Sequence, residues 1–308
     1  MQSPWGDLAV SDAHVHFFSH KFFANLASQA QATVESLGPV LNWQLPDQDP
    51  EHLAEMWVRE LDRHGVTRSV LIASVPGDYE SVIAAVRRFP QRFYGYTMVN
   101  PLAAEARSGV ESALSSGHLH GLCFFPAMHR YSIQDERVSE LLDVAAKHAP
   151  SGRSPVVFVH CGVLSVGVRK KLGLPSQFDM RFSNPIDVHA VAMRYPRTQF
   201  VIPHFGAGYF REALMLCDLC PNVWLDTSSS NSWMRYEGAH LDLREVFRRT
   251  LDVIGPNRLL FGTDSSFFPR GWNTQVYENQ TTALYEAGLK LEAAQLIFHH
   301  NLTRLFTY

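Results

Sequence analysis

Two histidines separated by a single residue stand near the start of the sequence, in the segment Ser11 to Phe17. In an extended strand alternate side chains point to the same face, so His14 and His16 can approach one metal ion together. A His-x-His pair also occurs on protein surfaces without any function, so the pair alone is weak evidence for a site. Its importance depends on which other polar residues the fold brings to it.

Three further polar side chains each end an apolar stretch that has the length of a buried strand. They are His160, His204 and Asp264. Placing an imidazole or a carboxylate at the end of a core strand is costly unless a partner compensates it. Taken singly, each has an ordinary alternative, either a histidine bonded to the backbone or an aspartate that caps a turn. Together with the first pair they form a donor set that suits one divalent metal ion, Zn²⁺ above all, with Mn²⁺ as an alternative.

Apolar strands alternate with amphipathic helices along the chain, and eight strands are expected, near residues 10, 70, 96, 123, 157, 201, 224 and 261. This alternation indicates a parallel sheet that is covered on both faces. Eight such units in 308 residues favour an α/β fold of the closed (β/α)8 TIM-barrel type, as one domain over residues 1–308. The alternative is an open doubly wound sheet, but the Gly-rich turn that usually follows its first strand is missing. In a barrel the carboxyl ends of the strands meet on one face, where the five polar residues would gather.

Residues 17–50 interrupt the alternation, because their aromatic, Gln and Pro residues show no clean period. Long ordered connections in compact domains tend to be lids or binding loops. We therefore expect a long loop insertion after the first strand that acts as a lid over the site.

The composition argues against several classes of partner. The 27 basic and 30 acidic residues give a net charge of -3 without a basic block, so nucleic acid is not an expected partner. No apolar run reaches the ~18 residues of a membrane-spanning helix, and the first ten residues lack the pattern of a secretory signal. Four irregularly spaced cysteines fit a reducing compartment, so a cytoplasmic location is expected.

Five segments carry a joint signal that extends from residue 12 to residue 306. They are Asp12-Ala13-His14-Val15-His16, Val159-His160-Cys161-Gly162, Pro203-His204-Phe205-Gly206-Ala207-Gly208, Leu260-Phe261-Gly262-Thr263-Asp264-Ser265 and Asn301-Leu302-Thr303-Arg304-Leu305-Phe306. In this combination the sequence resembles the amidohydrolase superfamily, specifically the amidohydrolase-related branch of metal-dependent TIM-barrel hydrolases and decarboxylases.

The resemblance implies a ligand set. By its pattern one metal ion is held by four residues, and His204 is a catalytic or substrate-orienting residue. The four ligands are His14, His16, His160 and Asp264. In relatives with two ions a carbamylated lysine at the end of strand four commonly bridges them. The matching segment here offers Cys123 and Phe125 but no lysine, so a mononuclear site is expected. The resemblance also implies a homodimer or a larger assembly.

The resemblance and the donor set together predict a metal-dependent hydrolase that acts on a small organic lactone, amide or ester. A divalent ion held in this way lowers the pKa of its bound water toward ~7. Asp264 would then take the proton of the water and pass it to the leaving group, while the metal and His204 polarise the carbonyl.

Two alternatives remain open at this stage. The first is non-oxidative decarboxylation of an aromatic or unsaturated carboxylic acid, for which cationic and aromatic loop residues would bind the substrate. The candidates are Arg130, Arg181, Arg235, Arg270 and Trp272. Any single arginine has an ordinary reading as a solvated surface residue. The second alternative is a non-catalytic binding protein stabilised by metal, but structural zinc sites are usually closed and rich in cysteine.

Overall fold

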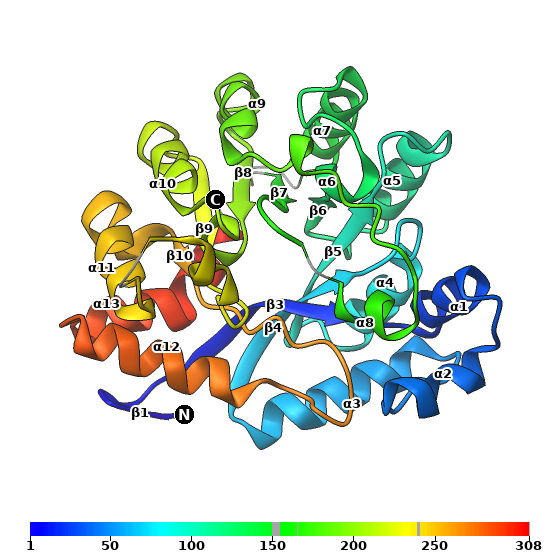
Figure 1. Cartoon of the computed structure of the whole chain (residues 1–308), viewed down its shortest axis with the longest axis horizontal. Helices are drawn as coiled ribbons and strands as arrows, with labels where there is room; N and C mark the ends of the chain where they lie inside the picture. Colours follow the sequence, from blue (N-terminus) through cyan, green and yellow to red (C-terminus); the bar gives the residue numbers. More distant parts are fainter. Residues whose placement is uncertain (150–154, 165, 239–240, 308) are drawn as a thin grey trace.

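The computed structural model describes residues 1–149, 155–164, 166–238 and 241–307. Eight strands form a single parallel sheet whose spatial order follows the chain (Figure 1). The strands are β3 (Val10–Phe17), β4 (Val66–Ala73), β5 (Phe93–Val99), β6 (Gly121–Phe124), β7 (Val156–Val159), β8 (Gln199–Ile202), β9 (Val223–Asp226) and β10 (Leu259–Leu260). A small antiparallel hairpin precedes them, formed by β1 (Gln2–Ser3) and β2 (Gly6–Asp7).

Helices surround the sheet on its outer side (Figure 1). The α-helices are α1 (His20–Gln29), α2 (Val34–Leu41), α3 (Pro50–Arg63), α4 (Tyr79–Arg88), α5 (Ala106–Ser115), α6 (Pro126–His129), α7 (Glu136–His148), α8 (Gly167–Lys171), α9 (Val188–Arg194), α10 (Phe210–Leu219), α11 (Leu243–Ile254), α12 (Thr274–Glu286), α13 (Leu291–Gln295) and α14 (Asn301–Leu305). Short 3₁₀ turns lie at η1 (Met180–Phe182), η2 (Pro185–Asp187), η3 (His204–Gly206), η4 (Ser232–Tyr236) and η5 (Pro256–Arg258), and a π-helical segment, η6 (Leu296–His300), joins α13 to α14. In the part of the chain that the structure describes, no helix combines the length and the apolar character that crossing a bilayer requires.

The interior of the barrel is filled by alternate side chains of the strands. In β5, for example, Tyr94, Tyr96 and Met98 belong to the inner apolar cluster, whereas Phe93 and Val99 belong to the outer one under the helices. This two-residue period is what a strand buried on both faces requires.

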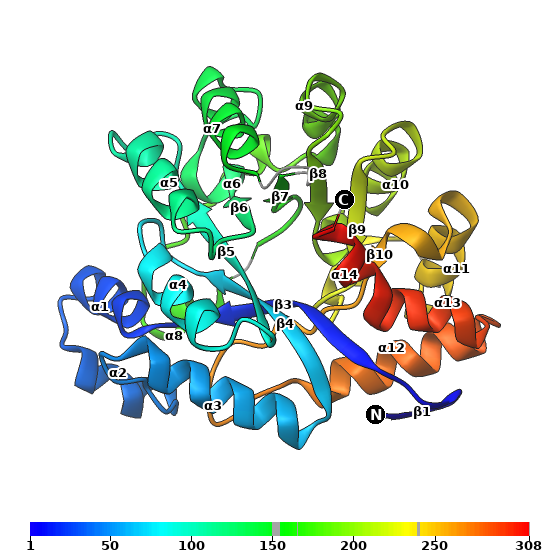
Figure 2. The ribbon, with the colours of Figure 1, turned by 180° about the vertical axis from the view of Figure 1, so that it is seen from behind.

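The amino-terminal mouth of the barrel is closed by the end of the chain. Leu302 and Leu305 of α14, with Phe306 after it, join the inner cluster, and the Phe306 ring stacks on Tyr94 with the ring centroids 4.0 Å apart. Seen from behind, α14 lies across this end of the barrel (Figure 2). Only the opposite mouth, at the carboxyl ends of the strands, is left for a site.

The barrel closes between β3 and the residues that follow β10. The Ala13 amide donates to the Phe261 carbonyl at 2.8 Å, the Asp264 amide to the His14 carbonyl at 3.0 Å, and the His16 amide to the Ser265 carbonyl at 2.8 Å. We call these three hydrogen bonds the closing seam. The predicted TIM barrel is confirmed. The last predicted strand is shorter than expected, because only Leu259–Leu260 pairs regularly with β9.

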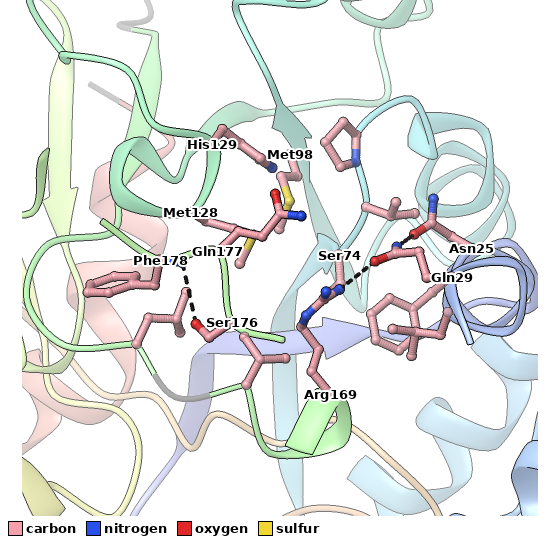
Figure 3. A pocket seen from close by; sticks show the side chains of 16 residues that line it. Asn25, Gln29, Ser74, Met98, Met128, His129, Arg169, Ser176, Gln177 and Phe178 are labelled. Atoms are coloured by element: carbon pink, nitrogen blue, oxygen red, sulfur yellow. Dashed lines mark hydrogen bonds between the residues drawn. The ribbon is translucent and has the colours of Figure 1, made fainter. Parts of the chain in front are cut away.

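The insertion after the first strand is not the irregular loop that the sequence suggested. It contains α1 and α2, whose apolar side chains form a small cluster together with Val168 of α8. The helical period was hidden because α2 is short and includes Pro39. The insertion is attached to the loop after β10, where the Trp43 ring stacks on Phe267 at 4.0 Å. One wall of a pocket above the strand ends comes from α1 (Figure 3).

Gly162, just after β7, provides a test of this packing. It has a φ of +77°, and a Cβ at this position would collide with the backbone carbonyl oxygens of Gly206 and Ala207. Gly162→Ala should therefore cost the usual ~1–2 kcal/mol of a left-handed alanine and on the order of 2 kcal/mol more from the collision. Urea unfolding midpoints measure the loss. Gly173→Ala is the matched control, because Gly173 has a φ of +67° and open space around it. Equal losses in the two variants would contradict the prediction.

Candidate metal centre

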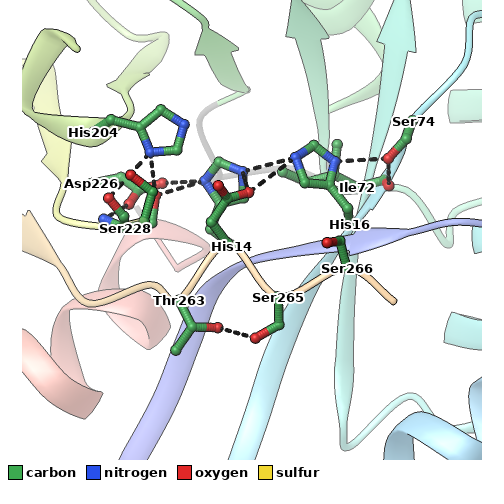
Figure 4. Close-up of polar contacts among 12 residues, drawn as sticks. His14, His16, Ile72, Ser74, His204, Asp226, Ser228, Thr263, Ser265 and Ser266 are labelled. Carbon is green, nitrogen blue, oxygen red and sulfur yellow. Dashed lines mark hydrogen bonds and ion pairs between the residues drawn. The ribbon is translucent and has the colours of Figure 1, made fainter. Parts of the chain in front are cut away.

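Two histidines of β3, labelled in Figure 4, meet an aspartate from beyond β10 at the open mouth of the barrel. One ligand atom each from His14, His16 and Asp264 lies within 4.8 Å of the other two. The Nε2 atoms of the two histidines are 3.4 Å apart. Asp264 Oδ1 lies 3.7 Å from His14 Nε2 and 3.3 Å from His16 Nε2. The closing seam produces this meeting, since it bonds the Asp264 amide directly to the His14 carbonyl.

The outer nitrogens of both histidines are held by groups that accept hydrogen bonds. His14 Nδ1 lies 2.7 Å from Asp226 Oδ2, and a carboxylate can only accept. His16 Nδ1 lies 2.8 Å from Ser74 Oγ, whose own hydrogen is donated to the Ile72 carbonyl at 3.0 Å. Both Nδ1 atoms therefore carry a hydrogen, so each ring that has no proton on Nε2 directs a lone pair at the centre of the cluster.

The centre therefore attracts positive charge. Although burial raises it, the two imidazoles beside it, of His16 and His14, hold the pKa of Asp264 below its ordinary value. Although burial lowers it, the Asp226 carboxylate raises the pKa of His14. Two imidazole lone pairs and an ionised carboxylate that point at one place repel each other unless a cation lies between them. This donor set fits a divalent metal ion.

His160, the fourth predicted ligand, lies beside this group but outside its 4.8 Å limit. It follows β7, is only 3% exposed, and its Nε2 has no hydrogen-bond partner among the described residues. Burial, with His204 and His14 nearby, lowers its pKa well below the ordinary value, so the ring is neutral, as a metal ligand must be. Phe125 stacks on it with ring centroids 5.3 Å apart. A buried nitrogen without a partner requires a reason, and a metal ion would supply one.

The turn that follows β8 places His204 next to His14 and His160. Its ring centroid lies 5.0 Å from that of His14 and 5.4 Å from that of His160. Its Nδ1 is 2.9 Å from Ser228 Oγ, which orients the ring. His204 and Asp264 both have a positive φ, of 56° and 60°. Such backbone angles are costly outside glycine, and they concentrate at functional sites.

The fourth strand of the barrel, β6, carries no metal ligand. Cys123 is fully buried in the inner cluster, and burial raises the pKa of its thiol well above the ordinary value, so it stays protonated. Phe125 packs on His160 instead. With no lysine in β6, the residues present fit a site for one ion.

Two buried aspartates that support the site were not recognised from the sequence as its supports. Asp226 bonds His14, as described above. Asp12 accepts from the amides of His14 at 2.9 Å and Thr263 at 3.1 Å, and burial raises its pKa to about 6. Asp226 carried a usable signal, because it ends the apolar strand β9 just as the histidines end theirs. Asp12 had no local signal, because most of its partners lie at the far end of the chain.

The centre opens into a pocket of about 210 Å³. Its wall includes three of the predicted metal and catalytic residues, His160, His204 and Asp264. The predicted substrate residue Arg235 also lines it. Arg270 does not line this pocket, but its Nη2 donates to the Asp264 carbonyl at 3.3 Å.

The other predicted substrate residues lie elsewhere. Trp272 does not line this pocket: it is only 2% exposed, and its indole N–H donates to Asp12 at 2.8 Å. Arg181 is 82% exposed at its side chain and pairs with Asp179 at 2.7 Å. Arg130 is exposed and donates to a backbone carbonyl at 2.8 Å. Neither arginine lines the pocket at the centre.

Solved structures with the same fold include three that cover nearly the whole chain. An uncharacterised TIM-barrel protein of Bordetella bronchiseptica has a TM-score of 0.64 and 18% identity, over 97% of this chain and 98% of its own. A probable 2-pyrone-4,6-dicarboxylic acid hydrolase of Acinetobacter baumannii, with citric acid bound, has a TM-score of 0.61 and 15% identity, over 98% and 100%. An amidohydrolase of Burkholderia multivorans with bound zinc has a TM-score of 0.58 and 15% identity, over 97% and 99%.

The sequence comparisons show the family of the chain, whereas the solved structures show its fold. The protein fluG of Emericella nidulans is 30% identical over 135 residues, which are 40% of this chain and only 15% of that protein. The amidohydrolase family model matches residues 11–307, from the first histidine strand to the last helix. The chain therefore belongs to the amidohydrolase family.

Proposed function

We propose that the protein is a metal-dependent hydrolase that acts on a lactone, ester or amide of a small organic compound. The observation that carries this proposal is the convergence of His14, His16 and Asp264 on one point, beside the unpartnered nitrogen of His160. These four residues would hold one divalent ion, with Zn²⁺ the best fit to three nitrogens and a carboxylate. When bound, such an ion lowers the pKa of water and polarises a carbonyl group.

The residues around the pocket have distinct tasks in this proposal. Asp264, whose pKa lies below its ordinary value, is ionised at neutral pH and accepts a proton from the attacking water. It then returns that proton to the leaving oxygen or nitrogen as the bond to the carbonyl carbon breaks. His204 is buried and, because burial lowers its pKa, neutral, so it can orient the carbonyl without repelling the ion.

Two of the solved structures with the same fold support the proposal. One of them is described as a probable hydrolase of a dicarboxylic acid, and another contains zinc. Decarboxylation of a carboxylic acid is the second candidate, because Arg235 brings a positive charge to the wall of the same pocket. The two reactions differ in their product, since hydrolysis adds water and decarboxylation releases CO₂.

The metal content of the purified protein tests the first part of the proposal. We expect close to one zinc or manganese per chain by elemental analysis, and a clear loss in His14→Ala and His160→Ala. His52→Ala is the matched control, because His52 has a side chain that is 62% exposed and pairs only with acidic residues at the surface. Two ions per chain would contradict the single-ion site, and no uptake on reconstitution would contradict the whole proposal.

Turnover in H₂¹⁸O tests the reaction itself. A panel of lactones, esters and aromatic carboxylic acids is incubated with the metal-loaded protein, and mass spectrometry follows the products. Hydrolysis should place ¹⁸O in the new carboxylate, and Asp264→Asn should lower kcat by about 10²–10⁴-fold with metal still bound. Release of CO₂ without ¹⁸O uptake in the organic product would favour the decarboxylase instead. Near-normal turnover by Asp264→Asn would remove that residue from the proton transfer.

Asp226 should act on the metal through His14. In Asp226→Asn the side-chain amide can donate to Nδ1 and so favour the wrong tautomer of the ring, and we expect metal affinity to fall by about 10–100-fold. Competition with a chromogenic chelator measures it. Asp252→Asn on the outer helix α11, where the side chain is 64% exposed, is the control. Unchanged affinity in Asp226→Asn would show that the hydrogen bond does not tune the ligand.

A further inference from the structure

Figure 3 shows a second pocket, of about 220 Å³. It shares Leu164 with the first pocket. Ser74, which accepts the hydrogen bond from His16, is also part of its wall. Its other walls include residues of α1 of the insertion, of α6, and of the segment 166–178. The second pocket therefore lies at the carboxyl ends of the strands, on the same face as the metal centre.

The lining of this second pocket is apolar apart from one cation and a few neutral polar groups. The apolar part includes Phe22, Leu26, Met98, Met128 and Phe178. Among the described residues that line it there is no aspartate or glutamate, and Arg169 is the cation. An apolar pocket with few, well-placed polar groups is the usual form of a site for a small organic molecule.

Among the described residues, the groups that hold Arg169 in place are neutral acceptors. Its Nη1 donates to Gln29 Oε1 at 2.7 Å, and its Nε and Nη2 donate to the Pro175 carbonyl at 3.2 and 2.9 Å. Within the described residues no carboxylate forms an ion pair with it, whereas Arg181 nearby in the sequence is paired with Asp179. The half-buried guanidinium therefore keeps an uncompensated charge and unused N–H groups, and its planar fork matches a carboxylate.

His129 adds a second unsatisfied group to the same pocket. Its Nδ1 is buried and has no hydrogen-bond partner among the described residues. Burial lowers its pKa to about 4, so the ring is neutral at physiological pH and offers one donor and one acceptor. The His129 ring lines the pocket, and its buried nitrogen still needs a partner that the described residues do not supply.

We propose that this second pocket binds a carboxylate of the substrate through Arg169, with the apolar body of the substrate against Met98 and Met128 and a polar group of it at His129. The enzyme would thus select organic acids over their neutral analogues, and the insertion would contribute to this choice through Gln29. What happens to the substrate next rests on the proposed function at the metal centre, but binding in this pocket does not.

A matched pair of probes tests the proposal without any turnover. Titration of 4-fluorophenylacetate and of the neutral 4-fluorophenylacetamide, followed by ¹⁹F NMR, gives a dissociation constant for each. The wild-type protein should prefer the carboxylate by at least ~tenfold, as for a hydrogen-bonded ion pair. Arg169→Gln removes the cation. Gln29→Glu keeps the shape but places a carboxylate against Arg169 and so neutralises it. Arg107→Gln, an exposed arginine of α5 that pairs with Glu140, is the control.

The outcomes separate this proposal from the proposed function. Loss of the carboxylate preference in Arg169→Gln and Gln29→Glu, with unchanged amide binding and with Arg107→Gln like wild type, supports it, whether or not any turnover is found. A wild-type protein without the preference overturns it. So does a preference that survives in both variants, and its disappearance on treatment with a chelator would then assign the carboxylate to the metal centre.

Discussion

The closing seam between β3 and the residues after β10 is the constraint on which the site depends. Three backbone hydrogen bonds join residues from opposite ends of the chain, and one of them runs from the Asp264 amide to the His14 carbonyl. Because β10 is only two residues long, the chain leaves the regular strand early and can turn Asp264 into the cluster with a positive φ. Hydrogen bonds of the closing seam hold the backbone of Asp264 in this costly conformation.

Buried carboxylates next to the closing seam fix the orientation of the metal ligands, which the backbone alone could not do. Asp12 ties the His14 amide to the Thr263 amide, so the two ligand-bearing segments share one acceptor. Asp226 holds the outer nitrogen of His14. Burying a carboxylate is unfavourable unless it accepts several hydrogen bonds, and each of these does. The cost of burial is offset by the fixed orientation of the ligands, which a metal site requires.

The two mouths of the barrel have different tasks. The amino-terminal mouth is filled by α14 and contributes to stability, whereas the other mouth is left open by the strand ends and bounded by the insertion. The insertion is attached to the loop after Asp264 through Trp43 and Phe267, and it also supplies Gln29 to Arg169. The insertion therefore contacts both the loop that follows the metal ligand Asp264 and the wall of the second pocket.

The sequence by itself determined the barrel and the polar ends of its strands. Apolar runs and helical periods are local properties, so eight strands and the positions of His14, His16, His160, His204 and Asp264 could be found without coordinates. The predicted ligands His14, His16 and Asp264 do meet, because parallel strands bring their carboxyl ends to one face.

Only the tertiary structure decided which of the remaining polar and aromatic residues face the substrate. Trp272 is buried and bonded to Asp12, whereas Arg169, which no local pattern marked, stands in a pocket where the described residues supply no acidic partner. The partner of a side chain commonly lies far away in the sequence. Burial and pairing therefore follow from contacts that a local pattern does not contain.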